Sequence, residues 1–218
     1  MKKDEPTNKY KRITGANPED KIFIIGSGRV GTTFLVRLFT RLRFSTGIYP
    51  DEDEKGYEED IRAGCEVELE WTEDLEEMKK RFKEAPFILK GPAYSLDLKN
   101  MIDLGLVRVL HAFIPVRDFY KAAESRIDVG LDWIAGEIQK IDQSKVVKQY
   151  YSNALALGCA IEGCMMRDVP FTLMRFPDFM QDKEYCFGLI NRIFPNIDWN
   201  TFSPTFDDLA NPDQVKFK

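Results

Sequence analysis

A glycine-rich turn holds the residues whose types and spacing are best suited to chemistry. It runs Gly26-Ser27-Gly28-Arg29-Val30-Gly31-Thr32-Thr33 and follows the apolar run Lys21-Ile22-Phe23-Ile24-Ile25. Glycines let such a turn adopt left-handed torsions, so that several backbone N–H groups converge on one point, where the dipole of a following helix adds positive charge. Arg29 and the hydroxyls of Thr32 and Thr33 add further donors. The turn is therefore predicted to bind the phosphate or sulfate oxygens of a nucleotide.

This turn departs at one position from the phosphate-binding loop of kinases and GTPases. The pattern GxxxxGK[ST] is matched from Gly26 onward, but Thr32 stands where the lysine belongs. Those enzymes also use an acidic residue at the end of a neighbouring strand to hold Mg²⁺. The later predicted strands instead end in Lys90 and Arg117, so an anion site without a metal is expected.

Alternating apolar and amphipathic segments predict the elements that position the turn. Residues 21–25 form a β-branched run typical of a strand buried on both faces, and residues 32–43 carry apolar side chains on one helix face. Further strands are predicted at 44–49, 86–92, 107–116 and 169–175. Further helices are predicted at 71–83 with Thr72 as a cap, and at 96–104, 118–126, 145–167 and 185–193, the last clear helix. Strands that alternate with helices pair in parallel, so we expect an α/β fold, a three-layer sandwich with a mostly parallel sheet, similar to P-loop NTPases.

Length and charge limit the organisation of the chain and its partners. The 218 residues suffice for one core, so residues 21–218 are expected to form a single α/β domain behind a flexible N-terminal arm, residues 1–20. The net charge of -5 argues against a nucleic-acid partner, because that role needs a cationic surface. No segment has the apolar length of a secretory signal or a membrane span, which predicts a cytoplasmic protein.

Cysteine and histidine usage argues against a disulfide framework or a metal centre. The four cysteines, Cys65, Cys159, Cys164 and Cys186, show no CxxC spacing. They are expected to be free thiols. The one histidine, His111, lies within a predicted strand and is expected to be a core residue whose hydrogen bonds are satisfied.

The turn resembles the phosphosulfate-binding loop of the sulfotransferase family, in which Lys or Arg and one small residue precede Gly-Thr-Thr. A second family element is a strand-end arginine followed eight residues later by a serine, and it is similar to Arg117 and Ser125. Residues 87–92, which include Lys90, resemble the Lys-x-Pro strand end of the bacterial and Golgi-type branches. Residues 173–179 resemble the late Arg-Tyr-Glu-Asp-Leu segment of the family.

Two departures separate the chain from the cytosolic small-phenol branch. Phe119 stands where a proline usually follows Arg-Asp, and the C-terminal Gly-x-x-Gly-x-x-Lys segment is absent. The resemblance is therefore closer to the bacterial and Golgi-type branch.

The resemblance implies transfer of a sulfuryl group from 3′-phosphoadenosine 5′-phosphosulfate (PAPS) to an acceptor hydroxyl or amine, without a metal. It implies that Arg117 and Ser125 hold the 3′-phosphate and that Arg29 stabilises the leaving phosphate. Lys90 is a further catalytic candidate that could contact donor or acceptor, although a surface lysine is an equal alternative. The implied donor-binding residues of the turn are Gly28, Arg29, Val30, Gly31, Thr32 and Thr33.

The base that takes the acceptor's proton is less well defined. In one branch a histidine near the position of Lys90 does this, and none is present there; in another, a glutamate after the second strand does. Glu52 is our candidate within the acidic run 51–54, with Glu66 and Glu68 as rivals. The acceptor could be a small molecule or a carbohydrate.

Two other functions are compatible with these residues. One is a P-loop phosphotransferase or nucleotide kinase with a degenerate loop, which would require ATP and Mg²⁺. The other is a non-catalytic nucleotide-binding module that keeps the loop but lacks a base.

Overall fold

The computed structural model describes residues 17–47, 72–128, 130, 136–140 and 142–210. The described strands are β1 (Asp20–Ile24), β2 (Ile88–Lys90), β3 (Arg108–Val116) and β4 (Phe171–Arg175). The described helices are α1 (Thr32–Arg41), α3 (Leu75–Glu84), α4 (Ala93–Asp103), α5 (Phe119–Asp128), α6 (Lys145–Met166), α7 (Asp178–Gln181), α8 (Lys183–Asn191) and α9 (Trp199–Leu209), with a 3-10 turn, η2, at Gly136–Lys140. None of these helices is both long and apolar enough to cross a membrane.

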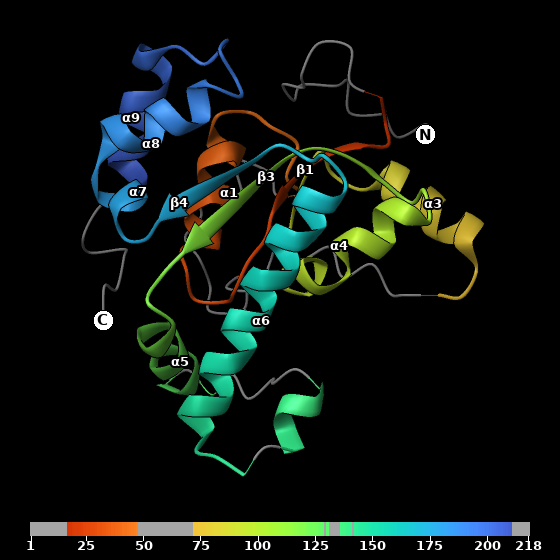
Figure 1. The fold of residues 1–218 in the computed structure, drawn as a ribbon. Helices are drawn as coiled ribbons and strands as arrows, with labels where there is room; N and C mark the ends of the chain where they lie inside the picture. The colour runs from red at the N-terminus through yellow and green to blue at the C-terminus, as the bar shows by residue number, and fades with distance from the viewer. Residues whose placement is uncertain (1–16, 48–71, 129, 131–135, 141, 211–218) are drawn as a thin grey trace, which may run out of the picture.

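The four described strands form one parallel sheet in the order β2-β1-β3-β4 (Figure 1). Every residue of β1 is buried, as predicted for a central strand. Ile22 and Ile24 belong to the core on one face of the sheet, and Phe23 belongs to the core on the other. The predicted α/β fold with a parallel sheet is confirmed.

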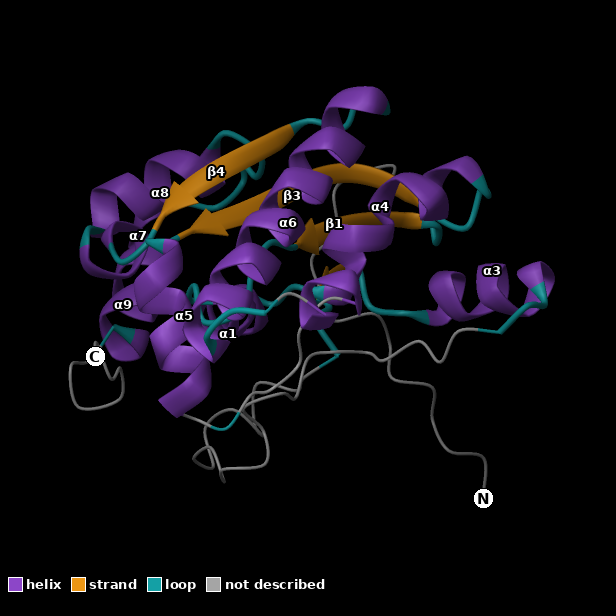
Figure 2. Ribbon diagram, turned by 60° about the horizontal axis from the view of Figure 1, so that its bottom comes forward, coloured by secondary structure: helices purple, strands orange, loops and turns teal. Residues whose placement is uncertain are grey.

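Helices cover both faces of this sheet, which gives the three predicted layers. Core residues of α1, α7, α8 and α9 pack on the face that carries Ile22 and Ile24, and those of α3, α4 and α6 pack on the opposite face. α5 packs against α6. Figures 1 and 2 show α7, α8 and α9 gathered beside β4, while α3 lies at the other side of the molecule.

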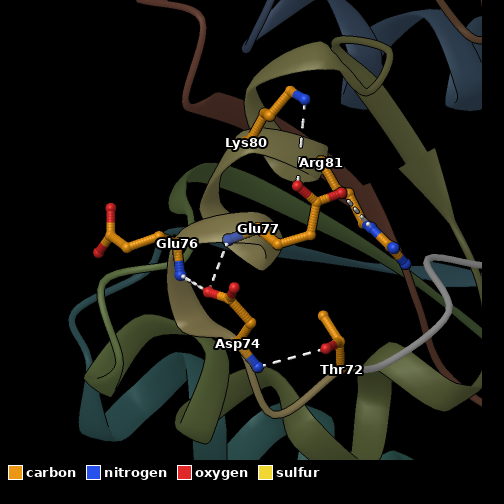
Figure 3. Close-up of polar contacts among 6 residues, drawn as sticks. All are labelled: Thr72, Asp74, Glu76, Glu77, Lys80 and Arg81. Carbon is orange, nitrogen blue, oxygen red and sulfur yellow. Dashed lines mark hydrogen bonds and ion pairs between the residues drawn. The ribbon is translucent and has the colours of Figure 1, made fainter.

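One local prediction was wrong for a reason of hydrogen bonding, and a second is met only in part. Asp74, not Thr72, caps α3, because its carboxylate accepts from the backbone N–H groups of Glu76 and Glu77 (Figure 3). The Thr72 hydroxyl accepts a hydrogen bond from the backbone of Asp74 instead. In the segment predicted as a strand at 44–49, Phe44 forms an isolated bridge and residues 45–47 are not strand, while residues 48 and 49 lie outside the described part of the chain.

A further helix, α9, follows the segment 185–193, which was predicted as the last clear helix. Asp198 caps this helix through the backbone N–H of Thr201, and Pro204 lies inside it. The helix is fixed by packing: Phe206 lies 5.5 Å from Phe34 of α1, measured between ring centres, at an edge-to-face angle. A proline in the middle of the segment hid it from a periodicity argument.

Candidate anion-binding site

The glycine turn lies at the point where the winding of the sheet changes direction. From β1 the chain passes to α1 on one face of the sheet, whereas α6, which follows β3, covers the opposite face. In open α/β sheets, ligands bind outside the carboxyl ends of the strands at such a point. Both the turn after Ile24 and Arg117 after Val116 occupy this position.

No side chain caps the amino end of α1. Gly26, Arg29 and Gly31 have positive φ angles of 127°, 65° and 83°. Gly31 is the residue that precedes the first helical turn, so no side chain there can cap the helix, and no acidic residue lies in that turn. The first N–H groups of a helix have no partner within it and carry partial positive charge. A bound phosphate group can supply the missing acceptor.

A serine from another element anchors the start of this turn. The Ser95 hydroxyl of α4 accepts a hydrogen bond from the backbone N–H of Gly26 at 2.8 Å and donates one to its carbonyl at 3.1 Å. Ser95 is fully buried. The turn is therefore tied to α4 as well as to the end of β1.

Three residues that the sequence placed in two separate motifs are in contact. The Nε of Arg29 donates to the Ser125 hydroxyl at 3.2 Å, and an Nη of Arg117 donates to the carbonyl of Arg29 at 3.1 Å. The Arg117 guanidinium also lies over the Phe176 ring, 4.8 Å from its centre. The structure thus joins the glycine turn to the β3–α5 connection.

The positive groups in this cluster influence one another. Burial lowers the pKa of Arg117 first, and the nearby charge of Arg29 lowers it further, while Asp118 acts in the opposite direction. The pKa of Arg126 is lowered by burial and then by Arg29. Like charges close together are unfavourable unless an anion compensates them. An anion bound here would reduce the repulsion between these guanidinium groups.

Aromatic and sulfur side chains pack against the other side of the turn. A methyl group on Gly31 would lie 2.7 Å from the Met180 sulfur, 2.7 Å from the Phe179 ring and 3.0 Å from the Phe176 ring. These residues belong to the segment that follows β4. This segment overlaps residues 173–179, which resemble the late element of the sulfotransferase family. The structure brings that segment to the turn.

The remaining residues of the turn divide between core and surface. Val30 is fully buried, Thr32 is buried, and Thr33 and Gly28 are half-buried. The Val30 side chain is buried in the core, so only the backbone of this residue is available to a ligand. The hydroxyls of the two threonines lie at the first turn of α1, where an anion could accept from them.

The other predicted site residues have different outcomes. Lys90 is only 6% exposed at the carboxyl end of β2, beside Ile24, so the surface alternative is wrong. Glu52 and its rivals Glu66 and Glu68 lie outside the described residues.

His111 is a core histidine whose hydrogen bond is satisfied, as predicted. Its Nε2 shares a 2.9 Å hydrogen bond with the Thr172 hydroxyl. Burial lowers its pKa to about 4, so it is neutral at pH 7.

The described thiols are free, as predicted. Cys164 and Cys186 are buried and Cys159 is half-buried. Burial raises the pKa of Cys164 to about 11, so it is not a nucleophile at neutral pH. Within the residues that the structure describes, no group of three or more His, Cys, Asp or Glu side chains could hold a metal ion.

Sequence reasoning missed Ser95, Arg126 and Gln149. Arg126 is buried on α5 together with Ala122 and Ala123, which lie four and three residues before it. An arginine on the small, apolar face of a short helix is a signal of a specific role that could have been found. A serine in the first turn of a helix 69 residues from the turn gives no comparable signal.

Comparisons with known proteins concern the fold. No family model matches the chain, and no curated protein does. Among solved structures, the sulfotransferase domain of the Synechococcus PCC 7002 olefin synthase is 16% identical with a TM-score of 0.46, over 96% of this chain and 86% of that one. A sulfotransferase domain from the curacin biosynthetic pathway is 13% identical with a TM-score of 0.49, over 93% of this chain and 82% of that one. The solved structures that this chain resembles thus include sulfotransferase domains from biosynthetic pathways.

Proposed function

We propose that this protein is a sulfotransferase that moves a sulfuryl group from PAPS to an acceptor hydroxyl or amine. The observation that carries the proposal is the contact of Arg29 with Ser125 and of Arg117 with the Arg29 carbonyl. These residues belong to the two motifs that resemble the donor-binding elements of sulfotransferases. Their contact beside the uncapped end of α1 supports one site for both phosphate groups of the nucleotide.

The residues present fit such a donor in charge and in position. The first turn of α1 has no side-chain cap from Gly31, so its amides and the hydroxyls of Thr32 and Thr33 can hold the 5′-phosphate. Arg117 presents a guanidinium fork that suits a phosphate, and Ser125 can donate a further hydrogen bond. The donor supplies an activated sulfuryl group, which is transferred to the acceptor oxygen or nitrogen.

The chemical contribution of the protein is electrostatic. Negative charge grows on the bridging oxygen of the phosphate as it leaves, and Arg29, whose Nε is held by Ser125, is placed to stabilise it. Lys90, buried at the carboxyl end of the neighbouring strand, is a second cation for the same edge of the sheet. Glu52 is proposed to accept the acceptor's proton. The acceptor is proposed to be a small molecule or a carbohydrate.

A transfer assay tests this function. The protein is incubated with PAPS labelled in its sulfuryl group and a panel of hydroxyl and amine acceptors, and the labelled products are separated. Transfer that is retained in Arg192→Ala, an exposed arginine at the end of α8, but lost in Arg29→Ala supports the proposal. Phosphoryl transfer from ATP–Mg²⁺ in a parallel assay would favour the kinase instead. Donor binding with no transfer to any acceptor would favour the non-catalytic module.

A further inference from the structure

Gly28 is next to a buried arginine that no motif includes. A methyl group built on Gly28 would lie closer than 3.0 Å to an Nη of Arg126, a distance that real side chains do not show. Gly28 does not have the positive φ angle that Gly26 and Gly31 have. A side chain at position 28 would therefore have to displace the guanidinium beside it, whereas the backbone conformation does not itself require glycine.

A second contact fixes the position of this guanidinium. The Nε of Arg126 donates a 2.6 Å hydrogen bond to the Oε1 of Gln149, which is fully buried on α6. Arg126 itself is 7% exposed. The Arg126 side chain, which starts on α5, thus contacts both α6 and the glycine turn. A substitution of Gln149 is therefore expected to move the guanidinium that lies beside Gly28.

The Arg126 guanidinium is buried close to a second positive charge, that of Arg29. Burying a guanidinium costs free energy, and the charge of Arg29 close by adds repulsion, which together lower the pKa of Arg126. A negatively charged ligand bound at the turn would interact favourably with both guanidinium groups.

We propose that Arg126 is a positioning residue for the phosphate-binding turn: held by Gln149, its guanidinium packs on Gly28, sets the path of the turn and adds positive charge behind it. The inference rests on the proposed function and names a third arginine for the same donor. It assigns Gln149 the role of holding Arg126. It also implies that a side chain at residue 28 would displace the end of the Arg126 side chain.

A double-mutant cycle between Gly28→Ala and Arg126→Gln tests the proposal. Calorimetry gives the dissociation constant for 3′,5′-phosphoadenosine, and urea unfolding gives the free energy of unfolding for the same four proteins. In the wild-type background, Gly28→Ala is expected to weaken binding about tenfold, because the new methyl group displaces the guanidinium or the turn. In the Arg126→Gln background the same change should have a much smaller effect, since the obstacle is gone. Arg126→Gln alone should also weaken binding and flatten its dependence on KCl, which packing alone would not do.

Matched variants separate positioning from general damage. Gln149→Leu keeps Arg126 but removes its acceptor, and it should weaken binding in the same direction. Gly188→Ala, in α8, and Arg192→Gln, at the residue that follows α8, change the same residue types at exposed positions, and neither should alter binding.

Each outcome has a distinct meaning. Strictly additive effects of Gly28→Ala and Arg126→Gln on both binding and unfolding would overturn the contact. Additive effects on binding with coupling only in the free energy of unfolding would overturn the role in the donor site. If the wild-type protein binds no 3′,5′-phosphoadenosine, the proposed function fails and the donor-site role fails with it, while coupling in unfolding would still show the contact.

Discussion

Ser95 and Gly26 exchange two hydrogen bonds, one in each direction. The Ser95 hydroxyl lies 2.8 Å from the Gly26 nitrogen and 3.1 Å from its oxygen, and both residues are buried. A peptide group that leaves the end of a strand has lost its ladder partners, and here one hydroxyl replaces them. α4 therefore sets where the glycine turn begins.

Ser95→Ala should destabilise the protein by about 1–3 kcal/mol, because it leaves a buried N–H and a buried carbonyl without this partner. Urea unfolding measures the change. Ser203→Ala, at a half-buried position of α9, is the control and should stay within about 0.5 kcal/mol of the wild type. Equal effects of the two substitutions would show that the contact with Gly26 adds nothing to stability.

Two glycine substitutions should have opposite signs. Gly31→Ala forces an alanine into a φ of 83° and against Met180 and Phe179, so we expect at least about 2 kcal/mol of destabilisation. Gly188→Ala, inside α8 with nothing within 4 Å of the new methyl group, should stabilise by about 0.5–1 kcal/mol. Thermal unfolding of both variants checks the signs. A neutral Gly31→Ala would contradict the described packing of the turn.

Arg29→Ala should lower turnover by about 10²–10³-fold while leaving the free energy of unfolding nearly unchanged, because the side chain is exposed and acts on charge that develops in the reaction. Arg117→Ala should instead weaken donor binding by about 10- to 100-fold, as expected for loss of hydrogen bonds to a charged phosphate. Steady-state kinetics with varied donor separates the two effects. Wild-type turnover in Arg29→Ala, or wild-type donor affinity in Arg117→Ala, would remove the role assigned to that residue.

Acidification should destabilise the protein through His111. Burial lowers its pKa from 6.5 to about 4, so between these values the unfolded chain binds a proton that the folded chain does not. Stability from this group is present above pH 6.5 and is lost as the pH falls toward 4, by at most about 1.4 kcal/mol per pH unit. Asp20, whose carboxyl pKa is lowered below 3.8 chiefly by its hydrogen bond with Arg108, acts at lower pH. Urea unfolding between pH 4.5 and 7 should show a smaller slope for His111→Gln than for the wild type; identical slopes would contradict this role.

The sequence predicted the elements whose pattern is local. β1 is an uninterrupted apolar run and α6 a long periodic segment, and both were found within one or two residues of their observed bounds. The turn was predicted because glycine spacing and the following threonines form a contiguous signal. The pairing of Arg117 with the turn followed from the resemblance, and the structure supplies the contact itself.

What could not be predicted depends on distant contacts. Ser95 reaches Gly26 only because α4 packs beside β1, and Gln149 reaches Arg126 only because α5 packs on α6. α9 contains Pro204, which argues locally against a helix, yet its phenylalanines complete the core beside α1. Tertiary packing overrides local preference in each case.

Calorimetric titration of the wild-type protein with 3′,5′-phosphoadenosine, in parallel with ATP–Mg²⁺, tests the central claim most directly. The account predicts that 3′,5′-phosphoadenosine binds without added metal, more tightly than ATP–Mg²⁺, and that Arg117→Ala weakens this binding. Tighter binding of ATP–Mg²⁺, or no binding of 3′,5′-phosphoadenosine, would contradict it.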